Sequence, residues 1–137
     1  MNPRHLTPDL AVMPQIEPDD FVALAQAGFT TVIANRPDAE VEPTHRSDVM
    51  AERATRAGLT YHYLPIVPGQ LGPDQVARFR EIMDSSPGPV LAYCRSGTRS
   101  ATAWALGQAG DRPADEILSA GRSAGYDLSH LGPMLRR

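Results

Sequence analysis

The chain has 137 residues, 42% hydrophobic and 21% charged, which is enough apolar material for a single domain over residues 1–137. Acidic residues outnumber basic ones by 16 to 13, so the net charge is −3. This balance argues against nucleic acid or an anionic membrane surface as a partner, because no basic excess exists to neutralise phosphates. No apolar run approaches the ~20 residues that span a bilayer.

The sequence contains one cysteine, Cys94, and its N-terminal segment lacks the layout of a signal peptide. A single cysteine can form neither an intrachain disulfide nor a cysteine-rich metal site. The histidines, His45 and His62 among them, show no metal-binding spacing. We therefore expect a protein of the reducing cytoplasm that needs no metal and no cofactor.

In the first half of the chain, short β-like runs alternate with helical patterns. The sequence predicts an apolar run at residues 10–13, a helix from about 18 to 28, a strand at 29–34, a helix at 46–57 and a strand at 59–64. Gly28 and Gly58 follow the two helices, where a left-handed residue commonly ends a helix.

In the second half, a Pro- and Gly-rich run over residues 65–73 precedes a helix with Val76, Phe79 and Met83 on one face. A strand at 90–93 and helices at about 100–109 and 114–120 follow. This alternation predicts an α/β fold, with a mostly parallel central sheet flanked by helices. Ligands of such sheets bind beyond the carboxyl ends of the strands, and Cys94 lies at one of these ends.

Residues 94–100, Cys-Arg-Ser-Gly-Thr-Arg-Ser, form a tight polar segment between a predicted strand and a predicted helix. The backbone N–H groups of such a turn can converge on an anion. Cys94 would be biased toward the nucleophilic thiolate there, and Arg99 offers a planar fork to an oxyanion. We expect these two residues to be catalytic, and we expect the anion to be bound by Arg95, Ser96, Gly97, Thr98 and Ser100. A cysteine packed as a small hydrophobe is the alternative, which suits these polar neighbours poorly.

The loop resembles the active loop of rhodanese-type sulfurtransferases, in which four residues separate the cysteine from an arginine. It is also similar to the phosphate loop of cysteine-dependent phosphatases, where five residues separate them. Here Ser100 occupies the position of the phosphatase arginine. Tyr93 stands before the cysteine, where phosphatases commonly carry histidine.

A wider resemblance covers nearly the whole chain. Together with the Cys94 loop, three segments resemble the beta-lactamase-hydrolase-like protein, phosphatase-like domain family: Ile16-Glu17-Pro18, Val32-Ile33-Ala34-Asn35-Arg36-Pro37 and Ala124-Gly125-Tyr126-Asp127. The resemblance implies a dual-specificity-phosphatase type of α/β fold. It also implies either phosphatase or sulfur-transfer activity, and a sulfur-dioxygenase-type enzyme as a possible partner.

The two chemistries differ in their need for an acid. Cleavage of a phosphate monoester needs a group that protonates the leaving oxygen. Residues 64–70, where such phosphatases would keep an aspartate, contain none, and the nearest carboxylate, Asp74, fits a helix-capping role better. Sulfur transfer has no such need: Cys94 would take sulfane sulfur from thiosulfate or a persulfide and pass it to an external thiol, sulfite or cyanide.

The sequence therefore favours, by a small margin, a sulfurtransferase that forms a Cys94 persulfide from a small anionic sulfur substrate. The alternative is a phosphatase that acts on a phosphate substrate through a phosphocysteine at Cys94, and the third possibility is a non-catalytic anion-binding module. Arg36, after the strand at 29–34, is a further candidate for binding an anionic substrate. An ion pair of Arg36 with Asp38 or Glu40 is an equally good interpretation.

Overall fold

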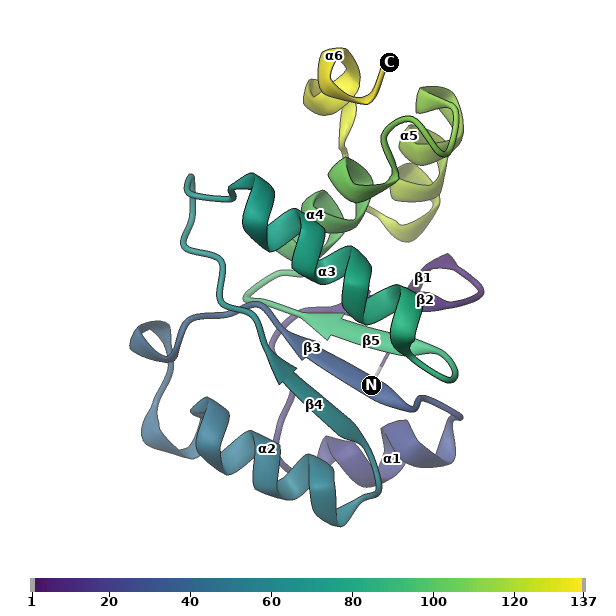
Figure 1. The fold of residues 1–137 in the computed structure, drawn as a ribbon. Helices are drawn as coiled ribbons and strands as arrows, with labels where there is room; N and C mark the ends of the chain where they lie inside the picture. Colours follow the sequence, from purple (N-terminus) through teal and green to yellow (C-terminus); the bar gives the residue numbers. More distant parts are fainter. Residues whose placement is uncertain (1, 137) are drawn as a thin grey trace.

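The computed structural model describes residues 2–136, and its centre is a five-stranded sheet with the order β1-β2-β5-β3-β4 (Figure 1). Strand β1 is antiparallel to β2, and all other neighbouring strands are parallel. The strands are β1 (Arg4–Thr7), β2 (Leu10–Met13), β3 (Thr31–Ala34), β4 (Thr60–Tyr63) and β5 (Val90–Tyr93). The predicted α/β fold with a mostly parallel sheet is confirmed.

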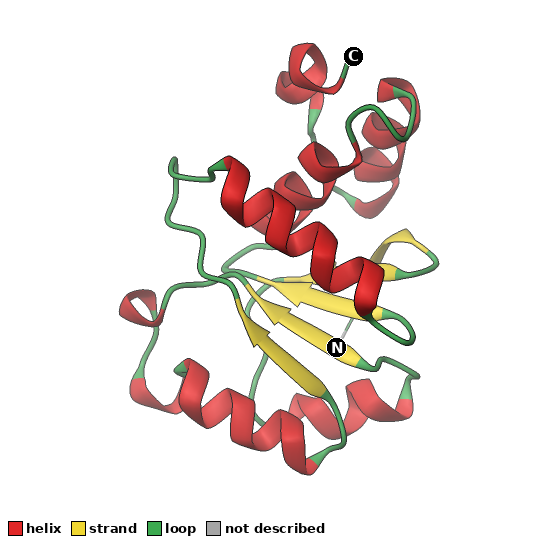
Figure 2. Ribbon diagram, viewed as in Figure 1, coloured by secondary structure: helices red, strands yellow, loops and turns green. Residues whose placement is uncertain are grey.

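Helices cover both faces of the sheet (Figures 1 and 2). One face carries α1 (Asp20–Gln26) and α2 (Ser47–Arg56). The other carries α3 (Pro73–Ser85), α4 (Thr98–Gln108), α5 (Ala114–Ala124) and the short α6 (Gly132–Leu135). Three 3₁₀ turns complete the structure: η1 (Asp38–Glu40), η2 (Pro43–His45) and η3 (Ser129–Leu131).

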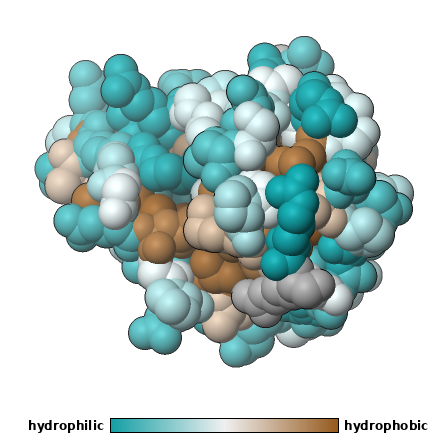
Figure 3. Space-filling view, turned by 90° about the horizontal axis from the view of Figure 1, so that it is seen from above, coloured by the Kyte–Doolittle hydropathy of each residue, from teal (hydrophilic) through white to brown (hydrophobic). Residues whose placement is uncertain are grey.

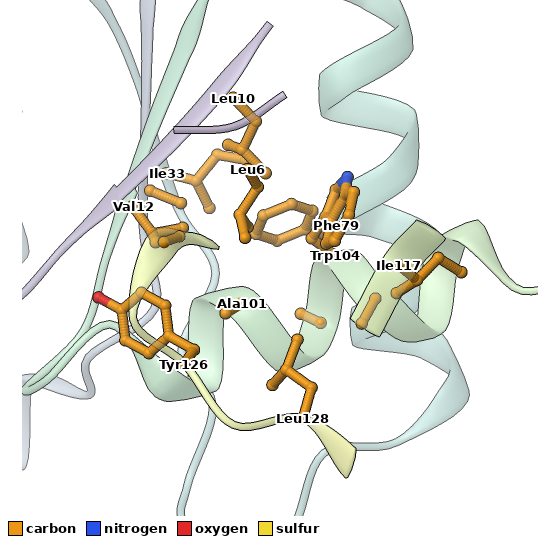
Figure 4. Close-up of a cluster of buried hydrophobic side chains, with 14 of the residues drawn as sticks. Leu6, Leu10, Val12, Ile33, Phe79, Ala101, Trp104, Ile117, Tyr126 and Leu128 are labelled. Carbon is orange, nitrogen blue, oxygen red and sulfur yellow. The ribbon is translucent and has the colours of Figure 1, made fainter. Parts of the chain in front are cut away.

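Successive residues of the central strands are buried on opposite faces of the sheet. In β5, Val90 and Ala92 join the cluster beneath α3, α4 and α5, whereas Leu91 and Tyr93 join the cluster beneath α1 and α2. Figure 4 shows part of the first cluster, with Phe79 and Trp104 among its members. Every residue of β2, β3 and β5 is buried. Because both faces of these strands are covered, their sequences read as continuous apolar runs. Strand β5, which leads into Cys94, is therefore fixed on both sides.

The structure adds the 3₁₀ turns and α6 to the predicted elements, shifts several element ends by a few residues, and differs more clearly at β1 and α5. The edge strand β1 was not predicted, because only two of its four residues are buried and it shows no apolar run. Helix α5 continues through Gly121 to Ala124, beyond the predicted end at residue 120. Gly121 is tolerated inside this helix because a Cβ there would lie 2.8 Å from a methyl group of Leu128, so the small residue makes room for core packing.

The end of the molecule that carries α5 and α6 has a mainly hydrophilic surface with apolar groups exposed between polar ones (Figure 3). Met134 in α6 is 52% exposed. It borders a cavity of about 570 Å³ whose other apolar walls include Leu71, Val76 and Leu106. No helix in the described part of the chain is long and apolar enough to cross a membrane.

Candidate active site

The loop after β5 places Cys94 at the carboxyl end of the central strand, as predicted, and α4 begins at Thr98. Gly97 is the N-cap residue of α4 and has a left-handed conformation with φ of +97°. Glycine is required here for two reasons. Its φ disfavours any residue with a Cβ, and a Cβ at this position would collide with the hydroxyl oxygen of Tyr126.

The sulfur of Cys94 lies at the base of this loop. Cys94 is 0% exposed, and its Sγ accepts a hydrogen bond from the backbone N–H of Gly97, with an N···S distance of 3.1 Å. Arg95, Ser96 and Thr98 form the exposed rim of the loop. The predicted meeting of thiol and backbone N–H is therefore present at Gly97. The assignment of the rim residues to anion binding stays a prediction.

Arg99 extends from the first turn of α4 and is held by Glu40 of η1. Its Nη1 donates to Oε2 of Glu40 at 2.9 Å and its Nη2 to Oε1 at 2.8 Å, which is a bidentate ion pair. Nη1 also donates to the carbonyl oxygen of Ile66 at 2.7 Å. These contacts come from two loops at the same edge of the sheet, and they fix the direction of the guanidinium plane.

The charges of this pair respond to each other and to the cysteine. The pKa of Arg99 is raised above its usual value, mainly by its hydrogen bond to Glu40 and also by the neighbouring Cys94, against the opposing effect of burial. The pKa of Glu40 is lowered, mainly by the hydrogen bond from Arg99, again against burial. The site therefore keeps a fixed positive charge close to the sulfur.

Ser100 connects the start of α4 to the ends of two strands. Its hydroxyl is buried and donates to Oδ1 of Asn35 at 2.7 Å, and Asn35 donates from Nδ2 to the carbonyl oxygen of Leu64 at 2.8 Å. The backbone N–H of Asn35 also donates to the carbonyl oxygen of Tyr93 at 2.8 Å. The hydroxyl of Ser100 is thus turned toward Asn35 and not into the loop. The observed role of Ser100 is to connect α4 to the strand ends, and its contact with an anion stays a prediction.

Arg36 forms the predicted ion pair with Glu40, with Nε and Oε1 3.4 Å apart. Its Nη2 also donates to the backbone oxygen of Glu40 at 3.1 Å, and its Nη1 to Oε1 of Gln15 at 3.3 Å. Arg36 and Glu40 line a cavity of about 310 Å³ together with Gln15, Val41, Glu42 and His45. The observed role of Arg36 is to support Glu40, and its contact with a substrate stays a prediction.

Asp74 is exposed in the first turn of α3. The N-terminus of this helix is closed by Gln75, whose Oε1 accepts the backbone N–H of Gly72 at 2.8 Å, so the predicted capping role of Asp74 is wrong. The described residues include no hydrogen bond between Asp74 and Cys94. Within residues 2–136, no three His, Cys, Asp or Glu side chains group closely enough to hold a metal ion.

Sequence reasoning missed three residues that shape the loop: Glu40, Asn35 and Tyr126. The phenol hydroxyl of Tyr126 donates to the carbonyl oxygen of Ser96 at 3.1 Å. Tyr126 and Asn35 did lie in segments that carry the family resemblance, which was the available signal. Glu40 had been considered only as a partner of Arg36. The arrangement gathers a thiol, a backbone amide and a guanidinium at one edge of the sheet.

Comparisons with known proteins identify the family and the type of fold. Residues 2–111 match the family described as "Beta-lactamase hydrolase-like protein, phosphatase-like domain". A beta-lactamase hydrolase-like protein of Xylella fastidiosa (strain Temecula1 / ATCC 700964) is 31% identical over 130 residues, which cover 93% of this chain and 30% of that protein. The chain thus spans less than a third of the length of this curated relative.

Solved structures show the same fold. A candidate phosphatase from Neisseria meningitidis is 33% identical, with a TM-score of 0.83 over 96% of this chain and 94% of that chain. TpbA of P. aeruginosa, solved in complex with pTyr, is 16% identical, with a TM-score of 0.63 over 98% of this chain and 90% of that chain. These similarities confirm the expected phosphatase type of α/β fold. The chain therefore belongs to the family of the phosphatase-like domain of beta-lactamase hydrolase-like proteins.

Proposed function

We propose that this chain is a cysteine-dependent phosphatase that cleaves aryl phosphate esters through a phosphocysteine at Cys94. The observation that carries the proposal is the position of Sγ, at the base of a loop that presents the Gly97 N–H at 3.1 Å and next to a guanidinium fixed by Glu40. The family and the fold support it, and the TpbA complex with pTyr indicates an aryl phosphate as the substrate class.

The reaction proceeds in two displacements. The thiolate of Cys94 attacks phosphorus, the bond between phosphorus and the ester oxygen breaks, and the leaving group departs with the bonding electron pair. Water then attacks the phosphocysteine, releases inorganic phosphate and restores the thiolate. The guanidinium of Arg99 stabilises the charge that develops on the equatorial oxygens, and the Gly97 N–H, which contacts the sulfur, stabilises the thiolate when it attacks and when it leaves. We also propose that the enzyme works in the cytoplasm, where the reducing environment keeps a lone thiol available as the nucleophile.

The absence of a carboxylate from residues 64–70 restricts the leaving group. Ile66 in this segment contacts Arg99 only through its backbone carbonyl oxygen, which cannot protonate a leaving group. Without a positioned acid, an ester is cleaved readily only if its leaving oxygen is a weak base. A phenolate satisfies this condition far better than an alkoxide, so we expect aryl phosphates to be preferred over alkyl phosphates.

Sulfur transfer is the second candidate, and two observations favour it. Four residues separate Cys94 from Arg99, as in rhodanese-type loops, and no acid lies in residues 64–70. Attack of the Cys94 thiolate on the outer sulfur of thiosulfate would form a persulfide and release sulfite, which needs no protonation. An external thiol, sulfite or cyanide would then remove the sulfur.

A side-by-side assay of p-nitrophenyl phosphate and thiosulfate separates the two candidates. We expect release of p-nitrophenol by the wild type, its loss in Cys94→Ser, and a far smaller effect of Arg95→Ala than of Arg99→Ala. Arg95 is the matched control because it carries the same charge on the exposed rim. A gain of one sulfur atom in intact mass with thiosulfate, without phosphate release, would overturn the phosphatase proposal. Protection of Cys94 from alkylation by sulfate without either turnover would favour a non-catalytic anion-binding module.

A further inference from the structure

We propose that Tyr126 is a positioning residue for the active loop: its hydroxyl fixes the peptide between Ser96 and Gly97 so that the Gly97 N–H points at the sulfur. This role deepens the proposed function, and it rests on the use of the loop to bind an oxyanion. Tyr126 acts on the single peptide unit between Ser96 and Gly97, whose C=O and N–H groups both form hydrogen bonds.

The two polar groups of this peptide have different partners. The carbonyl oxygen of Ser96 accepts the Tyr126 hydroxyl at 3.1 Å, and the N–H of Gly97 donates to Sγ of Cys94 at 3.1 Å. The described chain has no cis peptide bond, and in a trans peptide the C=O and N–H groups point in opposite directions. Holding the oxygen on the Tyr126 side therefore holds the N–H on the sulfur side.

This peptide would otherwise be free to turn over. Ser96 is exposed, and Gly97 can adopt φ values of either sign because it has no Cβ. A rotation of about 180° would bring the Ser96 carbonyl oxygen toward Cys94. The partial negative charge of that oxygen would repel both a thiolate and a bound oxyanion. The active orientation thus depends on a partner for the carbonyl oxygen.

Tyr126 is well suited to be this partner because its own position is fixed. Tyr126 is 6% exposed and its ring packs in the core cluster, while its hydroxyl points out of that cluster (Figure 4). The guanidinium carbon of Arg4 in β1 lies 5.6 Å from the ring centre, in cation–π contact. The backbone N–H of Tyr126 donates to the carbonyl oxygen of Gly121 at 2.8 Å, just after α5. The phenol is therefore held from three sides.

The phenol keeps its proton to a higher pH than an ordinary tyrosine. The pKa of Tyr126 is raised, mainly by burial, with a further contribution from the charge of Cys94, against the opposing effect of Arg4. Burial and the neighbouring sulfur thus keep the hydrogen on the oxygen that contacts Ser96.

The test compares Tyr126→Phe with the wild type. The variant keeps the buried ring and removes only the hydroxyl. Tyr61→Phe is the matched control, since it also removes a partly buried hydroxyl contact, the one with Tyr93 at 2.8 Å, and has no hydrogen bond to residues 94–97. Cys94 is the only cysteine, so alkylation by iodoacetamide reports on this site alone. The sulfate concentration that halves the alkylation rate measures anion binding without any turnover.

We expect this half-protecting sulfate concentration to rise about three- to tenfold in Tyr126→Phe, the effect of losing one hydrogen bond, and to stay unchanged in Tyr61→Phe. The Gly97 amide proton, followed by NMR, should exchange with solvent faster in Tyr126→Phe than in the wild type. Arg4→Gln, which loosens the ring but keeps the hydroxyl, should give a smaller rise in the same direction, and it decides the question if Tyr126→Phe does not fold.

Unchanged sulfate protection and Gly97 exchange in a folded Tyr126→Phe would overturn the inference, even if the variant melts at a lower temperature. The same holds if sulfate fails to protect the wild type. If sulfate protects the wild type and Tyr126→Phe weakens that protection, while p-nitrophenyl phosphate is not hydrolysed, the positioning role stands and the proposed phosphatase activity fails.

Discussion

The replacement Glu40→Gln tests whether Glu40 orients the catalytic guanidinium. The amide keeps the size of the side chain but removes its charge, and it presents one acceptor oxygen where the carboxylate presents two. In the wild type, Arg99 donates to both oxygens at 2.8 and 2.9 Å. In the variant, an NH₂ group must face one N–H of Arg99, so at least one of these two bonds is lost.

The magnitude follows from the exposure of the pair. A hydrogen bond to a charged group contributes about 1.5–3 kcal/mol. The side chains of Arg99 and Glu40 are 17% and 27% exposed, so solvent screens part of this interaction. We therefore expect Glu40→Gln to weaken the interaction that orients Arg99 by about 2 kcal/mol. If the whole loss appears in the transition state, kcat/KM for p-nitrophenyl phosphate falls about 30-fold.

A double-mutant cycle is the appropriate assay, with kcat/KM measured for the wild type, Glu40→Gln, Arg99→Ala and the double variant. Because Glu40 is argued to act through Arg99, its replacement should have almost no effect once Arg99 is alanine. Glu42 is an exposed carboxylate that lines the same cavity as Glu40 and Arg36, so Glu42→Gln serves as the control and should leave kcat/KM unchanged. A 30-fold loss that persists in the Arg99→Ala background would refute the reasoning.

Two further predictions concern stability. Gly97→Ala should lower the free energy of unfolding by about 2 kcal/mol, because a Cβ is disfavoured at φ of +97° and meets the Tyr126 hydroxyl. Urea titration measures this change. A change below about 0.5 kcal/mol, the size expected of a neutral surface substitution, would contradict the prediction. The lowered pKa of Glu40 means that its ion pair stabilises the fold fully above the usual value of 4.5 and progressively less as the pH falls through the folded-state pKa. The stability difference between the wild type and Glu40→Gln should therefore be constant above about pH 5 and shrink in acid, and a difference that grows in acid would reverse the sign of this argument.

The sequence predicted the strand, loop and helix around Cys94 well because their signals are local. An apolar run, a polar segment with glycine and a helical pattern follow one another within residues 90–108, and they place Cys94, Gly97 and α4 correctly. The partners of the loop are distant in the chain. Glu40 lies 59 residues from Arg99 and Asn35 lies 65 residues from Ser100. No periodicity or spacing pattern links such residues, so only the fold could reveal these pairs.

The sequence was a poorer guide to the choice between sulfur transfer and phosphate ester cleavage. The spacing of Cys94 and Arg99 and the lack of an acid in residues 64–70 favoured sulfur transfer, whereas the family and the solved structures favour a phosphatase. Loop length alone decides little, because Glu40 and Ile66 set the direction of the guanidinium from outside the loop. In the proposed phosphatase mechanism, these two contacts would orient an arginine that stands one position closer to the cysteine.

The anchoring of the active loop at both ends has a consequence for inactivation by heat. On one side it continues from β5, where every residue is buried, and on the other it enters α4, where Ser100, Ala101 and Trp104 are buried. A mobile lid can melt well before the rest of a protein, but these anchors belong to the part that opens last. Loss of catalysis on warming and cooperative melting of the whole molecule should therefore coincide in one transition.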